Sequence, residues 1–130
     1  METAEIIGKI QQALQKCSLD SGIDKRDVRV KIIINEGFIA DGVKCSLMNK
    51  TNLVHDIEIR NLLGLDPLKS KIVSTYLSNT LKKLAKDGGI PTKDINARIY
   101  TTKEDFYPSV YLYNAGKAVR EITVAELTGN

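Results

Sequence analysis

Two stretches of this 130-residue chain repeat the same pattern of turn and apolar residues. The segment SLDSGIDKRDVRVKI, residues 18–32, aligns with AKDGGIPTKDINARI, residues 85–99, at a constant offset of 67 (18 to 85). The identical pairs are Asp20/Asp87, Gly22/Gly89, Ile23/Ile90, Asp27/Asp94 and Ile32/Ile99. A hydrophobic period does not demand aspartate or glycine at matched turns, so these identities favour an internal duplication.

The second pair of segments extends the repeat to the end of the chain. SLMNKTNLVHDIEIRNLLG, residues 46–64, aligns with YLYNAGKAVREITVAELTG, residues 111–129, now at an offset of 65 (46 to 111). The identical pairs are Leu47/Leu112, Asn49/Asn114, Val54/Val119, Ile57/Ile122, Leu62/Leu127 and Gly64/Gly129. The offset changes within an intervening loop, where insertions are tolerated. That loop holds Phe38-Ile39 and Phe106-Tyr107, which we expect to fold back over the ends of the core.

Each copy begins with an amphipathic helix. In the first copy the apolar face consists of Ile6, Ile7, Ile10, Ala13, Leu14 and Cys17. In the second copy Asp66-Pro67 is an N-cap followed by a proline at the first helical position, and Gly88-Gly89 ends the helix. The apolar stripe of this second helix consists of Val73, Leu77, Leu81 and Leu84.

Three strands follow in each copy. VRVKIIIN, residues 28–35, alternates apolar and polar residues, and its counterpart is INARIYT, residues 95–101. The next two strands form a hairpin around Asn49 in the first copy. In the second copy Asn114-Ala115-Gly116 suits a type I turn closed by a glycine bulge, and Thr51 in the first copy predicts a different turn there.

The predicted fold is therefore α+β, with two internally duplicated αβββ units related by a pseudo-twofold axis. We expect one domain over residues 1–130, made of units 1–65 and 66–130, with an antiparallel sheet and two helices packed on one face. The pattern leaves open whether the strands form one six-stranded sheet or two smaller sheets.

Composition narrows the class of protein and its compartment. Hydrophobic residues make up 42% of the chain and charged residues 27%, as in an ordinary globular protein. No apolar run approaches the ~20 residues that span a bilayer, so we expect no membrane contact. The first turn carries Glu2 and Glu5 where a secretory signal has basic residues, and we therefore expect a cytoplasmic protein with reduced cysteines.

The motifs that bind cofactors or metals are not found in the sequence. One histidine and two distant cysteines cannot form a recognisable zinc set. The acidic residues lack the spacing of a calcium loop, and no glycine-rich phosphate loop is present. We expect neither cofactor nor metal.

His55 is the only histidine and the natural centre of an enzymatic hypothesis. Strand alternation predicts that Leu53, His55, Ile57 and Ile59 share a buried face. It also predicts that Cys45 lies across the hairpin from His55, and Val110 across from Arg120. A Cys45/His55 pair could support nucleophilic chemistry. Neighbouring Asp56 would point to the other face and could not orient the imidazole, and arginine replaces histidine in the second copy, so we favour a structural role.

The outward face of the predicted sheet is unusually rich in residues that form interfaces. Alternation places Tyr100, Tyr111, Tyr113 and Arg98 on this face, and Ile33 and Met48 at the corresponding positions of the first copy. Tyrosine, methionine and arginine are enriched at protein interfaces. Tyrosine is also a good strand former, so a purely structural explanation stays open. Our first hypothesis is a non-enzymatic protein that binds a protein partner or self-associates through this face.

The runner-up hypothesis is a nucleic-acid-binding module. The tyrosines would stack on bases, while Lys31 and Arg98 contact phosphates. Lys71, Lys82 and Lys86 share the polar side of the second helix and could extend the phosphate contact, although a solvated helix face explains them equally well. The net charge of +3 permits nucleic-acid binding without demanding it.

Overall fold

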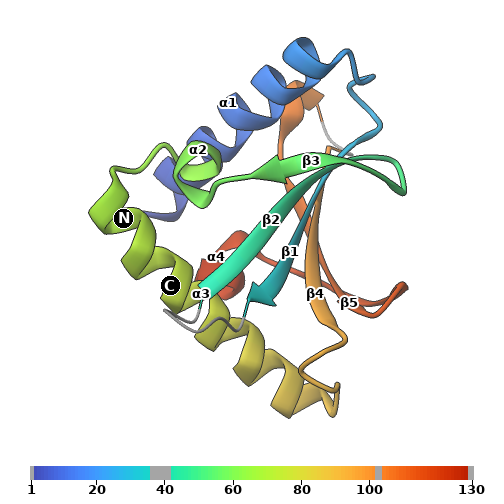
Figure 1. Cartoon of the computed structure of the whole chain (residues 1–130). Coiled ribbons are helices and arrows are strands. Elements are labelled where there is room, and N and C mark those ends of the chain that lie inside the picture. The colour runs from blue at the N-terminus through green and yellow to red at the C-terminus, as the bar shows by residue number, and fades with distance from the viewer. Residues whose placement is uncertain (1, 36–41, 102–103, 129–130) are drawn as a thin grey trace.

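The strands of the computed structural model form one antiparallel sheet in the order β3-β2-β1-β4-β5-β6. The structure describes residues 2–35, 42–101 and 104–128, and Figure 1 shows their arrangement. The strands are β1 Val28–Asn35, β2 Gly42–Asn49, β3 Asn52–Ile57, β4 Ile95–Tyr100, β5 Ser109–Asn114 and β6 Lys117–Ile122. The helices are α1 Thr3–Ser21, α2 Ile59–Leu63, α3 Pro67–Gly88 and α4 Val124–Thr128, with a 3-10 helix η1 at Glu104–Phe106. The fold is therefore α+β with a single six-stranded sheet.

The helix α3 begins and ends where the sequence predicts. Asp66 caps α3, because its Oδ1 accepts a hydrogen bond of 2.9 Å from the main-chain N–H of Lys69. Gly22 after α1 and Gly89 after α3 both adopt the left-handed conformation, with φ of 63° and 66°. In the part of the chain that the structure describes, no helix is long and apolar enough to cross a membrane.

The core lies between helices and alternate strand positions. Val28, Val30 and Ile32 of β1 are buried, as the alternation predicts. The apolar cluster that contains them also includes Ile6, Ile10 and Leu14 of α1, Leu77, Leu81 and Ala85 of α3, and Ile95, Ala97 and Ile99 of β4. The residues between these strand positions point to the opposite face of the sheet, which we call the outer sheet face.

Local geometry recurs at the positions that the sequence alignment matches. The N–H of Lys50 donates to the main-chain oxygen of Asp27 at 2.8 Å, and the N–H of Ala115 donates to that of Asp94 at 2.7 Å. Two further pairs of N–H to main-chain oxygen bonds are equivalent. Ile23 donates to Ser18 as Ile90 does to Ala85, and Asp27 donates to Asp24 as Asp94 does to Pro91. Each hairpin turn is thus fastened to the residue that precedes the first strand of its own half.

The prediction of different turns in the two halves is wrong. Asn49 pairs with Asn52 and Asn114 pairs with Lys117, so both hairpins have two-residue turns. The positive φ falls on Lys50 (56°) and on Ala115 (55°), and no glycine is required after either. The register shifts lie inside the strands, between Leu47 and Met48 and between Leu112 and Tyr113.

Two short helices replace the predicted continuation of the third strands. Ile59 lies in α2, and α4 begins at Val124. Leu62 and Leu127, three residues further along in each case, are buried in the core. Thr123 and Glu126 form a capping box at the start of α4: Thr123 Oγ1 accepts from the N–H of Glu126, and Glu126 Oε1 accepts from the N–H of Thr123.

The prediction that the loop aromatics fold back over the core can be compared with the structure at Phe106 and Tyr107. Phe106 is half-buried and packs against the core, and the ammonium group of Lys25 lies 5.5 Å from its ring centroid. Tyr107 is 37% exposed. Phe38 and Ile39 lie outside the described residues.

Candidate functional site

Five side chains from three adjacent strands form a compact cluster on the outer sheet face. This tyrosine–arginine cluster consists of Arg29 of β1, Arg98 and Tyr100 of β4, and Tyr111 and Tyr113 of β5. The ring centroids of Tyr100 and Tyr111 are 5.2 Å apart, and those of Tyr100 and Tyr113 are 6.4 Å apart. The hydroxyl groups of Tyr100 and Tyr113 are hydrogen-bonded to each other.

Both arginines of the cluster lie over tyrosine rings. The guanidinium carbon of Arg98 is 4.1 Å from the ring centroid of Tyr113, and that of Arg29 is 4.3 Å from the ring centroid of Tyr100. Cation–π contacts of this kind contribute about 0.5–2 kcal/mol. They explain why Tyr113 is only 8% exposed although it points away from the core.

A chain of hydrogen bonds fixes the position of Arg98. Its Nε donates to Oδ1 of Asn96 at 3.2 Å. The amide nitrogen of Asn96 donates to the main-chain oxygens of Asp94 at 3.2 Å and of Ala115 at 3.0 Å. Because the buried Asn96 is bonded both to Ala115 of the β5–β6 turn and to Arg98, this turn helps to hold the guanidinium in place.

One row of the outer sheet face, which crosses all six strands, carries four of its charged residues. The strand register aligns Asp56, Ser46, Lys31, Arg98, Tyr111 and Glu121 as successive neighbours from β3 to β6. Two basic side chains therefore occupy the centre of the row, and one carboxylate occupies each edge. At the β3 edge, Asp56 accepts from Ser46 Oγ at 3.2 Å and lies 3.5 Å from Lys44 Nζ.

Ile33 and Met48 lie beside the tyrosine–arginine cluster, as strand alternation predicts. Met48 is opposite Arg29 in the register, and Ile33 is opposite Asn96. Met48 is 8% exposed and Ile33 is half-buried, so their contribution to an open surface is small. Sequence reasoning missed Arg29, although it shares a strand face with Lys31 and Ile33.

The surroundings of Tyr113 change its ionisation. Desolvation is the largest cause that raises the pKa of its hydroxyl, followed by the hydrogen bond with Tyr100. Arg98 and Arg29 act in the opposite direction because their positive charges favour the phenolate. The hydroxyl therefore stays protonated beyond the usual tyrosine range.

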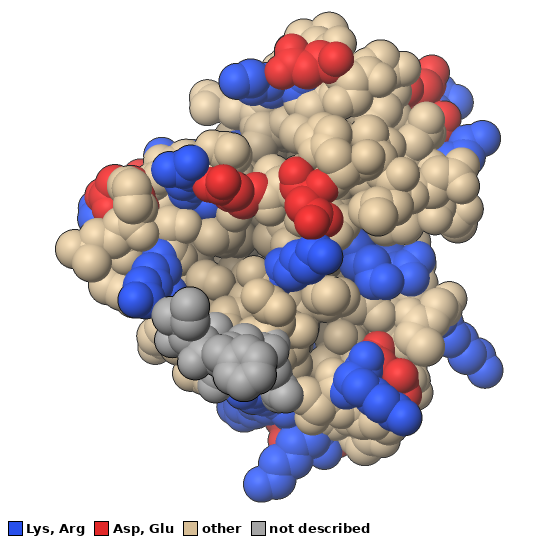
Figure 2. Space-filling view, viewed as in Figure 1, with Lys and Arg blue, Asp and Glu red and all other residues tan. Residues whose placement is uncertain are grey.

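The residues of the nucleic-acid hypothesis are divided between two surfaces. Lys31 and Arg98 are neighbours on the outer sheet face. Lys71, Lys82 and Lys86 lie on α3, whose Leu77 and Leu81 pack against the other face of the sheet. On the face of the molecule seen in Figure 2, basic and acidic side chains are interspersed.

The predicted environment of His55 is wrong in register and in burial. Leu47 is opposite His55, and Cys45 is opposite Ile57; likewise Leu112 is opposite Arg120, and Val110 is opposite Ile122. The two-residue turns and the register shifts displace the expected pairing. His55 is exposed, and Leu53 is 66% exposed, because β3 is an edge strand.

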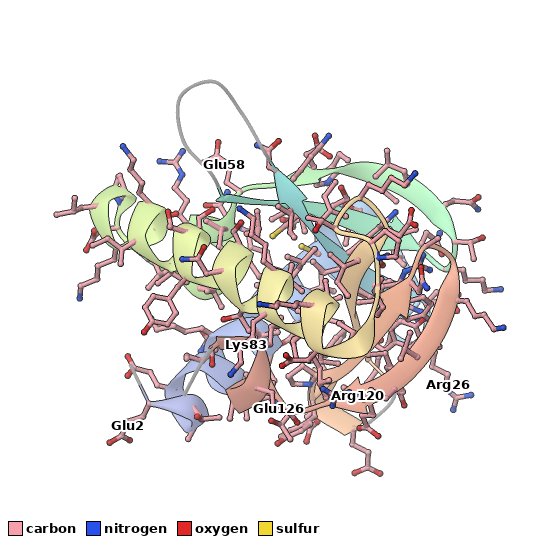
Figure 3. The ribbon with its side chains drawn as sticks, turned by 90° about the horizontal axis from the view of Figure 1, so that it is seen from below. Glu2, Arg26, Glu58, Lys83, Arg120 and Glu126 are labelled. Atoms are coloured by element: carbon pink, nitrogen blue, oxygen red, sulfur yellow. The ribbon has the colours of Figure 1, made fainter. Side chains whose placement is uncertain are left out.

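The two matched basic residues have different partners. Nδ1 of His55 lies 2.9 Å from the main-chain oxygen of Asp56. Nη1 of Arg120 donates to Oε2 of Glu126 at 3.2 Å, and Figure 3 shows these two side chains next to each other. Arg120 thus connects the edge strand β6 to the short helix α4.

A different cysteine shares a groove with His55. The groove of about 650 Å³ lies between α1, β3 and α2, and Cys17 and His55 are both in its lining. Burial raises the pKa of the Cys17 thiol, and Asp20 raises it further, which disfavours the nucleophilic thiolate. Burial raises the pKa of Cys45 to about 12. Among the described residues, no group of three or more His, Cys, Asp or Glu could hold a metal ion.

Sequence reasoning also missed an exposed apolar row on α3. Leu68 is 73% exposed, and Ile72 and Tyr76 are each 58% exposed. We call these three residues the α3 stripe. Their spacing of four residues was a visible signal, because residues i, i+4 and i+8 share a helix side.

Comparison with known proteins gives no relative: no family model, no curated protein and no solved structure matches this chain.

Proposed function

We propose that this protein is a non-enzymatic binding protein that holds a protein partner on its tyrosine–arginine cluster. The observation that carries the proposal is the stacking of Arg98 on Tyr113 and of Arg29 on Tyr100. Stacking orders both guanidinium groups in advance, so little conformational entropy is lost when a partner binds. Arginine and tyrosine are also the residue types that contribute most to binding at protein interfaces.

The arrangement favours a protein over a nucleic acid. A base needs a free aromatic face for stacking, whereas guanidinium groups already cover faces of Tyr100 and Tyr113. Glu121 at the β6 end of the charged row would repel a phosphate backbone that crosses the sheet, whereas the charge of Asp56 at the β3 end is offset by Lys44. A protein surface can place carboxylates over the central basic pair and basic or neutral groups over the rim.

The same row disfavours self-association through the centre of this face. Lys31 and Arg98 are direct neighbours, and a second copy centred on them would bring like charges together. A partner with one or two acidic side chains at the centre of its contact would satisfy both residues. We therefore infer that the partner is a different protein with an acidic contact surface.

The architecture that supports this role is an internally duplicated one. The equivalent turn bonds and the matched residues suggest two αβββ units, residues 1–65 and 66–130, that fused into one domain. We infer that both long helices cover one face, which leaves the outer sheet face open to a partner.

Site-specific photo-crosslinking in the source cell tests the proposal. A photoreactive phenylalanine analogue replaces Tyr111 in one bait and Leu19, which is 75% exposed on α1, in the control bait. We expect a protein that crosslinks at position 111 and does not crosslink at position 19. Adding Arg98→Glu to the first bait should reduce this crosslink by about tenfold or more, because a buried charge pair would be reversed.

Three results would count against the proposal. Crosslinks at position 111 that persist with Arg98→Glu would mean that the cluster does not select the partner. Crosslinks to a second copy of this chain would replace the partner with self-association. Crosslinks to nucleic acid, which weaken steeply with salt, would establish the nucleic-acid alternative instead.

A further inference from the structure

The α3 stripe is an apolar row without a covering element among the described residues. Single exposed apolar side chains are common on protein surfaces and need no explanation. Leu68, Ile72 and Tyr76 differ from that background because they are consecutive on one helix side and are all more than half exposed. Contiguous exposed apolar surface is typical of a binding site.

A hollow lies next to the stripe and could accept side chains of a partner. It has a volume of about 200 Å³ and lies where α3 meets the start of α1, the end of α2 and α4. Ile6, Leu63 and Val73 contribute to its lining, together with Ile72 and Tyr76 of the stripe. A second hollow of about 270 Å³ adjoins Ile72 on the side of Leu65 and Glu5. Side chains of a partner could therefore insert on that side of the stripe.

Lys69 and Lys71 flank the stripe, and one carboxylate, Glu5, lies at the second hollow. Between Pro67 and Lys86, α3 contains five lysines and no acidic residue. An advance of about 100° per residue places Lys71 beside the stripe, and Lys82, Lys83 and Lys86 follow on the same half of the helix beyond Tyr76, the C-terminal end of the stripe. Figure 3 shows Lys83 directed to the side of α3 on which the N-terminus of α1, marked by Glu2, also lies.

We propose that the α3 stripe and its adjoining hollow bind an acidic amphipathic helix of a partner protein. An amphipathic helix in a groove inserts apolar residues at positions i, i+3, i+4 and i+7. Such a helix would cover the stripe with these residues and place its acidic residues along the lysine row. Two charge-assisted contacts at the lysines would fix the direction of the helix as well as its affinity.

A second copy of the chain fits this surface less well. Antiparallel pairing of two α3 helices centred on Ile72 would bring Lys69 and Lys71 of both copies into one interface, where like charges repel. The site is also separate from the tyrosine–arginine cluster, because α3 packs on the other face of the sheet. Two partners could thus occupy the protein at the same time.

Titration of the full-length protein with a designed peptide, followed by backbone amide NMR, tests this inference. The probe is a capped helical peptide of about 18 residues, long enough to be partly helical alone. It carries leucine at the i, i+3, i+4 and i+7 positions and glutamate on both flanks. We expect saturable shifts at Leu68–Tyr76, Ile6 and Leu63, and no shifts in the tyrosine–arginine cluster.

Matched variants make the outcome decisive. Ile72→Gln and Lys71→Glu should each weaken binding by about tenfold, equivalent to about 1.4 kcal/mol. Leu19→Gln and Lys50→Glu change an exposed apolar residue and an exposed basic residue elsewhere and should leave the affinity unchanged. Arg98→Glu, which disrupts the cluster of the proposed function, should also have no effect here.

Several results would overturn the inference. One is the absence of shifts at millimolar peptide, and another is shifts that do not involve α3. Equal binding of a control peptide with lysine in place of glutamate would exclude recognition by charge. Concentration-dependent dimerisation that Ile72→Gln abolishes, with no peptide binding, would assign the surface to a second copy.

Discussion

The guanidinium of Arg98 lies 4.1 Å from the ring centroid of Tyr113, and the hydroxyl of that ring is hydrogen-bonded to Tyr100. Tyr113→Phe keeps the ring under the guanidinium and removes the hydroxyl bond. We expect a loss of about 1 kcal/mol in the free energy of unfolding. Tyr113→Ala removes the ring as well and should cost about 3 kcal/mol or more. Urea unfolding followed by circular dichroism measures both.

The Tyr113 prediction has a matched control on the helix side of the molecule. Tyr76 is 58% exposed, so Tyr76→Phe and Tyr76→Ala should each change the free energy of unfolding by about 0.5 kcal/mol or less. Similar costs for the two tyrosines would show that the tyrosine–arginine cluster contributes nothing to stability.

Alkaline titration gives a second test of the cluster. The folded protein holds Tyr113 protonated to higher pH than the unfolded chain does, because its pKa is raised mainly by desolvation. Its stabilising contribution is therefore complete below the ordinary tyrosine pKa of about 10 and is lost as the pH rises through the folded-state value. The midpoint of unfolding of the wild-type protein should decline between pH 9 and 12, and that of Tyr113→Phe should decline less. A decline of equal size would contradict the raised pKa.

Much of the fold could be predicted because local signals and the tertiary structure agree. Apolar alternation predicts the bounds of β1, and Asp66-Pro67 predicts the capped start of α3. The left-handed preference of glycine explains why a glycine ends each long helix. The register could not be predicted, because a one-residue irregularity inside a strand leaves no mark on apolar alternation. The two-residue turn and the shift between Leu47 and Met48 together moved Cys45 from His55 to Ile57.

Four of the five members of the candidate site were predicted, but Arg29 and the organisation of the cluster were not. Strand alternation identified the three tyrosines and Arg98. The stacking of Arg29 on Tyr100 depends on β1 lying beside β4, a pairing that joins residues about 70 positions apart. The capping box at Thr123 was readable as T-x-x-E, but the apolar alternation that continues through Val124 favoured a strand.

The two cysteines should differ sharply in reactivity. Cys45 is 2% exposed and burial raises its pKa to about 12, whereas Cys17 is half-buried at the groove that it shares with His55. We expect a thiol-specific disulfide reagent at pH 8 to label one thiol slowly in the native protein and the second only on unfolding. Cys17→Ser should abolish the native labelling. Native labelling of that variant would show that Cys45 is accessible.

The capping box of α4 predicts a pH-dependent contribution. The bond from the N–H of Thr123 is the largest cause that lowers the pKa of Glu126, and the bond from Arg120 is the next. A lowered pKa stabilises the fold above the ordinary glutamate range, and this contribution is lost as the pH falls through the folded-state value. Glu126→Gln should therefore be less stable than wild type at pH 7, and the difference should shrink toward pH 3. A difference that is constant with pH would exclude the charge as its cause.

Thr123→Ala tests the other half of the same capping box. It removes the Oγ1 that accepts from the N–H of Glu126 at 3.0 Å, and N-cap substitutions of this kind cost about 1 kcal/mol. This cost should persist from pH 7 to pH 3, because the hydroxyl does not titrate. Thermal unfolding at both pH values measures the difference. An unchanged midpoint would mean that α4 forms without its cap.

The two helix-ending glycines provide a test of equivalent geometry in the two halves. Gly22 and Gly89 have φ of 63° and 66°, and a Cβ at either position would have no atom within 4 Å. Gly22→Ala and Gly89→Ala should therefore each cost about 1–2 kcal/mol through backbone strain alone. Gly8 is the internal control: it lies inside α1 with nothing within 4 Å, so Gly8→Ala should stabilise by about 0.5–1 kcal/mol. Costs for Gly22→Ala and Gly89→Ala that differ by more than about 1 kcal/mol would show that the two helix ends are not equivalent, because their backbone conformations predict nearly the same strain.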